Sequence, residues 1–257
     1  MPDTYSEADL SACLASLGIR EGDCVFIHSS LKGVGKLETS DQDGMLHALL
    51  VRLLSAVGET GTLVSPTFNF GFCEGQTFDR QNTPAAGMGA FAEYFRTYPG
   101  AIRSKHPFQC ISAIGRQASR IANAEGRSAF SDGGPFDAML ALDCRILFFG
   151  VDFVETFVHV SEERAAVPYR FWKTFTSTYV DEGVSRQLSV DFFARNLEIV
   201  PEPFLDKPKF NRLLRGAGVI KGVPLGAGQV SICRAVELVD TLTAVLKEEP
   251  LGFLLGR

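Results

Sequence analysis

The sequence lacks the features that mark several large classes of protein. Its 257 residues carry 25 basic and 30 acidic side chains, so there is no cationic excess with which to bind a polyanion. The most apolar stretch, residues 138–154, is interrupted by Asp143, Arg145 and Asp152, and no run reaches the roughly 20 apolar residues that a membrane span requires. Residues 1–10 lack the basic and apolar regions of a signal peptide. We therefore expect a soluble, cytoplasmic protein that binds neither nucleic acid nor membranes.

Several catalytic and binding motifs are also missing. The six cysteines form no Cys-x-x-Cys pair and the four histidines have no His-x-x-x-His spacing, so zinc sites and thioredoxin-type chemistry lack their usual signatures. There is no Gly-x-Ser-x-Gly of a serine hydrolase. A Walker A loop and a Gly-x-Gly-x-x-Gly dinucleotide motif are absent as well. We therefore expect reduced, structural cysteines, no metal site and no permanently bound cofactor.

Apolar runs and helical patterns alternate along the chain, which is typical of an α/β protein with helices on the faces of a sheet. Strands are predicted at residues 24–30, 61–66, 109–115, 144–151 and 218–223, and helices at 6–17, 41–57, 88–98, 117–124, 135–142, 154–165, 206–215 and 231–248. Residues 167–200 differ, because two alternating segments flank Asp181-Glu-Gly183 as in an antiparallel pair. We predict one domain over residues 1–257, with a central mixed sheet flanked by helices and an antiparallel strand insertion at about 167–200.

The strongest candidate for a catalytic group is His159, shortly after the predicted strand at 144–151. On the predicted helix it shares a face with Glu155, Glu162 and Glu163. A carboxylate beside an imidazole fixes its tautomer and raises its basicity, which suits a general base. A helix that follows a strand also begins at the carboxyl edge of the sheet, where α/β proteins bind ligands. The alternative interpretation is a solvated helix face with ordinary His–Glu pairs.

A second candidate is the segment His28-Ser-Ser-Leu-Lys-Gly-Val-Gly35, which directly follows a predicted buried strand. Small residues and glycines let backbone N–H groups approach and surround a phosphate. A plain turn between a strand and a helix also needs glycine, so both interpretations stay open.

A third candidate is Arg103-Ser-Lys-His-Pro107, which leads into the predicted strand at 109–115. Two cations and a histidine at this place suit a pyrophosphate or a 3′-phosphate. They are equally compatible with surface charges around an extended His-Pro dipeptide.

In their order along the chain these segments resemble the aminoglycoside 3-N-acetyltransferase family. The resemblance covers most of the chain and runs most clearly from Gly22 to Arg170. The segments that carry it are His28-Ser-Ser-Leu…Gly-Val-Gly35, Gly61-Thr-Leu-Val-Ser-Pro-Thr-Phe68, Met88-Gly89, Arg103-Ser-Lys-His-Pro107, Thr156-Phe-Val-His-Val-Ser-Glu-Glu-Arg164 and Val167-Pro-Tyr-Arg170.

The resemblance implies transfer of an acetyl or other short acyl group from coenzyme A to a primary amine of an amino sugar. By the family pattern His159 is the general base and Glu162 orients it, with no covalent acyl-enzyme. The residues implied in binding coenzyme A are His28, Ser29, Ser30, Leu31, Arg103, Ser104, His106 and Cys110. Cys110 departs from the pattern, since the family usually has serine there. The weaker donor puts that contact in doubt, and a nucleophilic Cys110 is an alternative.

Two acceptor classes fit the remaining residues. A polycationic drug favours clustered carboxylates, for which the candidates are Asp79, Glu93, Asp152 and Glu155. The segment 171–178 resembles relatives that acylate nucleotide-linked deoxyamino sugars in surface-polysaccharide pathways. Arg170 and Lys173 would then meet the diphosphate, and Phe171 or Trp172 would stack on the base unless they pack in the core. This second acceptor is slightly favoured.

Two other functions remain open beside the N-acyltransferase. One is a non-catalytic protein that binds coenzyme A or a nucleotide, and the other is a thioester hydrolase that uses a water activated by His159. Thiol release with and without an amine separates the three. The expected partners are the small-molecule amino sugar and acyl-coenzyme A, and homodimerisation stays open.

Overall fold

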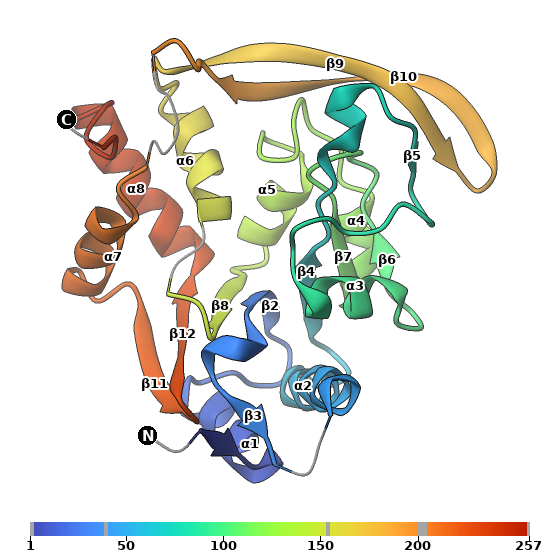
Figure 1. Cartoon of the computed structure of the whole chain (residues 1–257). Helices are drawn as coiled ribbons and strands as arrows, with labels where there is room; N and C mark the ends of the chain where they lie inside the picture. The colour runs from blue at the N-terminus through green and yellow to red at the C-terminus, as the bar shows by residue number, and fades with distance from the viewer. Residues whose placement is uncertain (1–2, 39–40, 153–154, 200–204, 256–257) are drawn as a thin grey trace.

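The computed structural model describes residues 3–38, 41–152, 155–199 and 205–255, and at its centre lies a seven-stranded mixed sheet (Figure 1). The strand order is β11-β12-β8-β2-β4-β7-β6. The middle strands β8, β2 and β4 are parallel, whereas β12 and β7 are antiparallel to them. The strands are β2 (Cys24–Ser29), β4 (Thr62–Pro66), β6 (Ile102–Arg103), β7 (Ile111–Gly115), β8 (Arg145–Phe149), β11 (Lys221–Leu225) and β12 (Gly228–Arg234). The predicted mixed sheet is confirmed.

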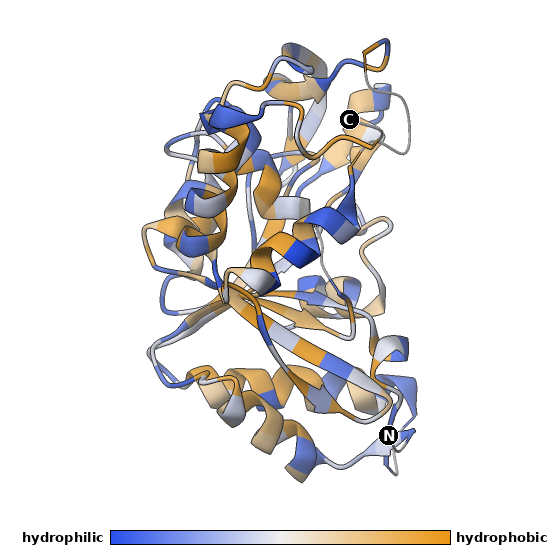
Figure 2. Ribbon diagram, turned by 90° about the vertical axis from the view of Figure 1, so that its left-hand side faces the viewer, coloured by the Kyte–Doolittle hydropathy of each residue, from blue (hydrophilic) through white to orange (hydrophobic). Residues whose placement is uncertain are grey.

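Helices cover both faces of this sheet, because consecutive strand residues point to opposite sides. Val25 and Ile27 of β2 pack in one core with α1, α2 and α3, and Phe26 packs in the other core with α4 to α8. Apolar residues are accordingly concentrated on the central strands (Figure 2). The helices are α1 (Glu7–Ser16), α2 (Gln42–Val57), α3 (Ala90–Thr97), α4 (Ala118–Ala122), α5 (Pro135–Leu140), α6 (Val158–Arg164), α7 (Lys207–Gly216) and α8 (Ala235–Glu248). Within the described ranges, no helix combines the length and apolarity needed to cross a bilayer.

Several helix starts follow from side chains that cap them. Ser6 and Asp9 form a reciprocal capping box at α1, and the carboxylates of Asp41 and Asp206 accept hydrogen bonds from backbone N–H groups in the first turns of α2 and α7. Such side chains satisfy N–H groups that have no partner inside the helix. These three helices therefore start within one residue of their predicted positions.

A long hairpin lies outside the main sheet. Its strands β9 (Arg170–Asp181) and β10 (Val184–Arg195) are antiparallel, and β5 (Phe78–Asp79) pairs with β9. The two turn residues, Glu182 and Gly183, both have positive φ, as a tight hairpin turn requires. Each strand has 12 residues, more than the alternating pattern predicts. The hairpin runs from the end of α6 across to β5 (Figure 1).

The C-terminal region differs from the prediction. The helix expected over 231–248 begins only at Ala235, and β12 occupies residues 228–234. β12 lies between β8 and β11, where Val230 and Ile232 alternate into the core on one face. A run of buried residues on a central strand cannot be distinguished from a buried helix by its periodicity. A further small sheet joins β1 (Thr4–Tyr5) to β3 (Lys36–Leu37), and short 3-10 helices lie at Leu31–Gly33 (η1), Phe70–Glu74 (η2) and Glu155–Phe157 (η3).

Candidate active site

The structure brings His159 and Glu162 together on α6. Nδ1 of His159 lies 2.6 Å from Oε2 of Glu162. The side chain of His159 is 21% exposed and that of Glu162 is fully buried. A partly open imidazole thus rests on a carboxylate that water does not reach.

Arg170, the first residue of β9, and Tyr169 just before it contact the same carboxylate. Nε of Arg170 lies 2.9 Å from Oε2 of Glu162, and the hydroxyl of Tyr169 donates a hydrogen bond to Oε1 at 2.9 Å. A second nitrogen of the guanidinium donates to the carbonyl of Phe193 on β10. Burial raises the pKa of Glu162, but the positive charges of Arg170 and His159 and the hydrogen bonds outweigh it, so the pKa lies below its ordinary value. Glu162 is therefore ionised at neutral pH.

An ionised carboxylate has no proton to donate, so in the 2.6 Å contact with Glu162 Nδ1 of His159 is the donor, and Nη2 of Arg170 lies 3.2 Å from the same nitrogen. In the neutral ring the lone pair then lies on Nε2. Phe130 packs against the imidazole, with ring centroids 5.2 Å apart. The arrangement can accept a proton at Nε2 while Glu162 stabilises the resulting imidazolium.

The turn after β2 requires glycine at position 33 because the backbone of the segment after β8 packs directly against it. A Cβ on Gly33 would lie 1.9 Å from the carbonyl oxygen of Gly150. The N–H of Ser30 donates to the carbonyl of Phe149 at 2.8 Å, so the turn after β2 and the segment after β8 lie side by side. The requirement for glycine at position 33 is thus explained by the protein alone.

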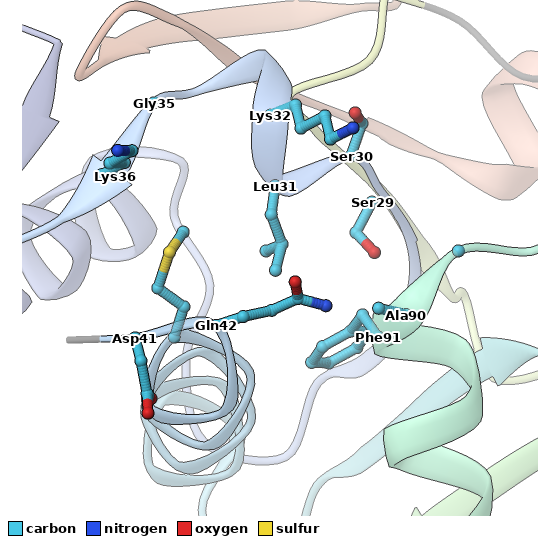
Figure 3. Close-up of a pocket in the computed structure, with 12 residues that line it drawn as sticks. Ser29, Ser30, Leu31, Lys32, Gly35, Lys36, Asp41, Gln42, Ala90 and Phe91 are labelled. Atoms are coloured by element: carbon cyan, nitrogen blue, oxygen red, sulfur yellow. The ribbon is translucent and has the colours of Figure 1, made fainter.

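The side of this turn that faces away from β8 borders a cavity of about 720 Å³. It lies between the turn and the N-terminal ends of α2 and α3, and Leu31, Gln42 and Phe91 point toward one another across it (Figure 3). The other lining residues are Ser29, Ser30, Lys32, Gly35, Lys36, Asp41, Met45, Gly89 and Ala90. Lys32 and Lys36 were not among the predicted site residues, although two lysines that flank a glycine-bearing turn are a signal for phosphate binding.

His28 lies on β2 beside a second, smaller cavity. Its ring packs against Phe26 and Phe148, and burial lowers its pKa to about 3. The cavity of about 280 Å³ shares Ser29 and Gly89 with the larger one. The imidazole of His28 is therefore neutral and lines the smaller cavity.

Arg103 and Ser104 lie between the loop 67–87 and β7 and contact both. The guanidinium of Arg103 donates to the backbone carbonyls of Thr67 and Thr83, and Oγ of Ser104 accepts from the N–H of Ile111. Both side chains are buried. Any contribution of Arg103 to a coenzyme site would therefore act through the loop that it holds.

His106 and Cys110 are also engaged within this region. Nδ1 of His106 accepts a hydrogen bond from the N–H of Gln109, and burial lowers the pKa of the ring to about 3. The buried thiol of Cys110 donates to the carbonyl of Thr67, and burial raises its pKa. A thiol that stays protonated is a poor nucleophile, so the geometry does not favour an acyl-cysteine.

The structure describes three of the four carboxylate side chains predicted for a polycationic acceptor, and two of these are hydrogen-bonded within the chain. Asp79 accepts hydrogen bonds from Gln81 and Asn82 in its own turn. Glu93 accepts from Arg96 and from the backbone of residue 85. Asp152 is exposed and borders a separate cavity, and the side chain of Glu155 lies outside the described part of the structure.

The aromatic and basic residues of β9 have different surroundings. Trp172 is partly buried against Phe193, and the guanidinium of Arg127 stacks on its indole at 3.8 Å. Phe171 is 47% exposed, and Lys173 is exposed above the ring of Phe175. Arg170, in contrast, is buried with Glu162. In the described parts of the chain, no three histidine, cysteine or acidic side chains are grouped so as to hold a metal ion.

Comparison with known proteins identifies the family of the chain. The family model of aminoglycoside 3-N-acetyltransferases matches residues 26–247. Aminoglycoside N(3)-acetyltransferase IV of a Salmonella species is 28% identical over 260 residues, which are 97% of this chain and 90% of the relative. A similar fold is found in the crystal structure of aminoglycoside acetyltransferase AAC(3)-IVa, a histidine-to-alanine variant in complex with a gentamicin. The two structures superpose with a TM-score of 0.79 at 27% identity, over 98% of this chain and 92% of the relative. AAC-IIIb, as a binary complex with coenzyme A, shares the fold with a TM-score of 0.81 at 20% identity, over 95% and 97% of the two chains. The chain therefore belongs to the aminoglycoside 3-N-acetyltransferase family and is an acyl-coenzyme A-dependent N-acyltransferase.

Proposed function

We propose that the protein transfers an acetyl group directly from acetyl-coenzyme A to a primary amine of an amino sugar, with His159 as the general base. The observation that carries the proposal is the 2.6 Å contact between Nδ1 of His159 and the ionised carboxylate of Glu162. This contact leaves Nε2 as the proton acceptor. The AAC(3)-IVa relative supports an amino-sugar acceptor, since it was crystallised with a gentamicin.

In the proposed reaction Nε2 of His159 removes a proton from the ammonium group of the sugar. The free amine nitrogen attacks the thioester carbonyl, and a tetrahedral intermediate forms. The nitrogen, which bonded to the carbonyl carbon in the attack, loses a second proton to solvent. Collapse then breaks the C–S bond and leaves the amide, and the proton held on the imidazole neutralises the departing thiolate. Glu162 stabilises the imidazolium between these steps, while Arg170 and Tyr169 keep Glu162 ionised and in place.

The large cavity beside the Ser29 turn is the proposed site for coenzyme A. It contains Lys32 and Lys36 and lies at the N-terminal ends of α2 and α3, and both features favour a phosphate group. The turn itself begins beside the segment that leads from β8 to α6. A thioester bound along this edge of the sheet would approach His159.

Replacing Lys32 by methionine is expected to raise the KM for acetyl-coenzyme A by at least about 10-fold, because a charge-assisted phosphate contact is worth about 1.5–3 kcal/mol. The KM for S-acetylpantetheine, which has no phosphate, should stay unchanged. Steady-state thiol release with both donors measures the difference. Lys221→Met, an exposed lysine on β11, is the matched control, and an equal loss with both donors would place Lys32 outside the phosphate site.

For the acceptor, the names of the relatives favour an aminoglycoside. A nucleotide-linked amino sugar is the second candidate, because the carboxylates of Asp79 and Glu93 are already hydrogen-bonded within the chain. Lys173 and Phe171, in contrast, are exposed and accessible to a nucleotide. The two classes differ in net charge, so Lys173→Glu should impair only the anionic acceptor.

The proposed function is tested by thiol release from acetyl-coenzyme A with a panel of aminoglycosides and a panel of nucleotide-linked 3- and 4-amino deoxysugars. Turnover with either panel supports the proposal and identifies the acceptor class. Equal thiol release without any amine would indicate a thioester hydrolase. Binding of acetyl-coenzyme A without thiol release in any mixture would indicate a non-catalytic binding protein.

A further inference from the structure

Glu163, the neighbour of Glu162 on α6, has contacts that the proposed reaction does not use. Its Oε1 accepts a hydrogen bond from Oγ of Ser128, and its Oε2 accepts one from Oγ of Ser131, both at 2.6 Å. The two serines lie more than 30 residues earlier in the chain. Glu163 therefore ties the catalytic helix to the turn at 128–131.

This turn is held by a dense set of hydrogen bonds. Oγ of Ser128 accepts from the backbone N–H groups of Phe130 and Ser131, at 3.0 and 3.1 Å. The N–H of Gly134 donates to the carbonyl of Ser131 at 2.9 Å. These bonds connect the backbone of Phe130 to the carboxylate of Glu163 through Ser128.

The side chain of Phe130 meets the catalytic imidazole. It is 2% exposed, and its ring packs edge-on against His159 and at 4.5 Å against Phe136 of α5. Glu162 holds the imidazole by its Nδ1 edge, and Phe130 limits its rotation from the side. Both carboxylates of α6 consequently act on His159, one directly and one through the turn.

Charge adds a second connection between Glu163 and His159. His159 lies four residues before Glu163, and such residues lie on the same face of a helix. Burial raises the pKa of Glu163, whereas the serine hydrogen bonds and the positive charges of His159 and Arg170 oppose the increase. The pKa of Glu163 stays above its ordinary value, and in its ionised form Glu163 favours a protonated imidazole.

We propose that Glu163 is a positioning residue for His159: it holds Phe130 against the imidazole through Ser128 and Ser131, and its charge stabilises the imidazolium that forms during acyl transfer. The inference rests on the proposed role of His159 as general base. It extends the catalytic arrangement from α6 to a turn that no recognisable motif marks.

Two variants separate the charge from the turn. Glu163→Gln keeps the shape but removes the anion, so kcat should fall about 10-fold, with the KM for acetyl-coenzyme A unchanged. Because loss of a nearby anion disfavours the imidazolium, the acid limb of the kcat/KM profile should move to lower pH by about half a unit or more. Ser128→Ala keeps the charge of Glu163 but removes the hydrogen bonds that hold Phe130. We therefore expect kcat to fall while the acid limb of the kcat/KM profile stays at its wild-type pH.

Asp240→Asn, an exposed change on α8, is the control for loss of one negative charge and should match the wild-type profile. Wild-type kcat and an unmoved acid limb in Glu163→Gln would overturn the inference. Circular dichroism shows whether Glu163→Gln is folded. If it is not, Ser128→Ala tests the inference in its place, and a wild-type kcat in Ser128→Ala would overturn the inference. Failure of the proposed function is distinguishable, because the wild-type enzyme itself would then release no thiol with any amine.

Discussion

Replacing His159 by alanine is expected to lower kcat about 1,000-fold, within the range that a general base contributes. Nε2 is the proposed proton acceptor, and no other described imidazole contacts Glu162. The fold should survive, since the side chain of His159 is partly exposed and Glu162 keeps its contacts with Arg170 and Tyr169. Thiol release at saturating acetyl-coenzyme A and amine measures the loss.

His47→Ala is the matched control for that experiment. His47 is a histidine of α2 whose Nδ1 contacts the hydroxyl of Tyr94, remote in the fold from the α6 network. Its loss should leave kcat unchanged. Near-normal turnover by His159→Ala, with a wild-type thermal transition, would contradict the assignment of the base.

Glu162→Gln is expected to affect both activity and stability. The amide cannot stabilise an imidazolium, so kcat should fall 100-fold or more, the order of magnitude of general-base catalysis. Arg170 would be left buried without its anion, and breaking a buried pair in this way costs about 3–5 kcal/mol of unfolding free energy. Chemical denaturation and thiol release measure the two effects.

The double variant Glu162→Gln/Arg170→Met provides the control, because it removes the buried cation together with its partner. Unfolding free energy should recover in part while activity stays low. A single variant Glu162→Gln as stable as the wild type would show that the Arg170 contact contributes nothing to the fold.

The same ion pair predicts a pH dependence of stability. The folded-state pKa of Glu162 lies below its ordinary value of 4.5, so folding favours the ionised form. The stabilisation is fully present above pH 4.5 and is lost as the pH falls through the folded-state value. The unfolding free energies of the wild type and of Glu162→Gln should therefore converge as the pH is lowered. A difference that stays constant with pH would contradict an ionised Glu162 in the folded state.

Most helices and strands could be predicted from local patterns. The capping side chains Ser6, Asp41 and Asp206 mark helix starts within one residue, because a cap acts over one turn of the chain. Short strands such as β3 and β6 were not predicted, and neither was β12, where burial from both sides removes the alternation that identifies a strand.

The candidate site was predictable only where its groups are close in sequence. His159 shares a helix face with Glu162 and Glu163, so helix geometry predicted a carboxylate beside it, and the resemblance to the family selected Glu162. The role of Arg170 does not, because its guanidinium reaches Glu162 only through the bend after α6, where Ala166 has a positive φ. The sequence suggested a phosphate contact for Arg170, whereas the structure buries it beside a carboxylate.

The amino-acid sequence by itself therefore determined the α/β class, the order of most elements and a carboxylate beside His159, since these depend on hydrophobic periodicity and on contacts within one turn of a helix. Only the tertiary structure decided which charges meet across the chain. It placed Arg170 on Glu162, Arg103 on the loop 67–87, and Glu163 on a turn more than 30 residues away. The physical reason is that buried polar groups take whichever partners the packing brings within hydrogen-bond distance, and packing is a property of the whole fold.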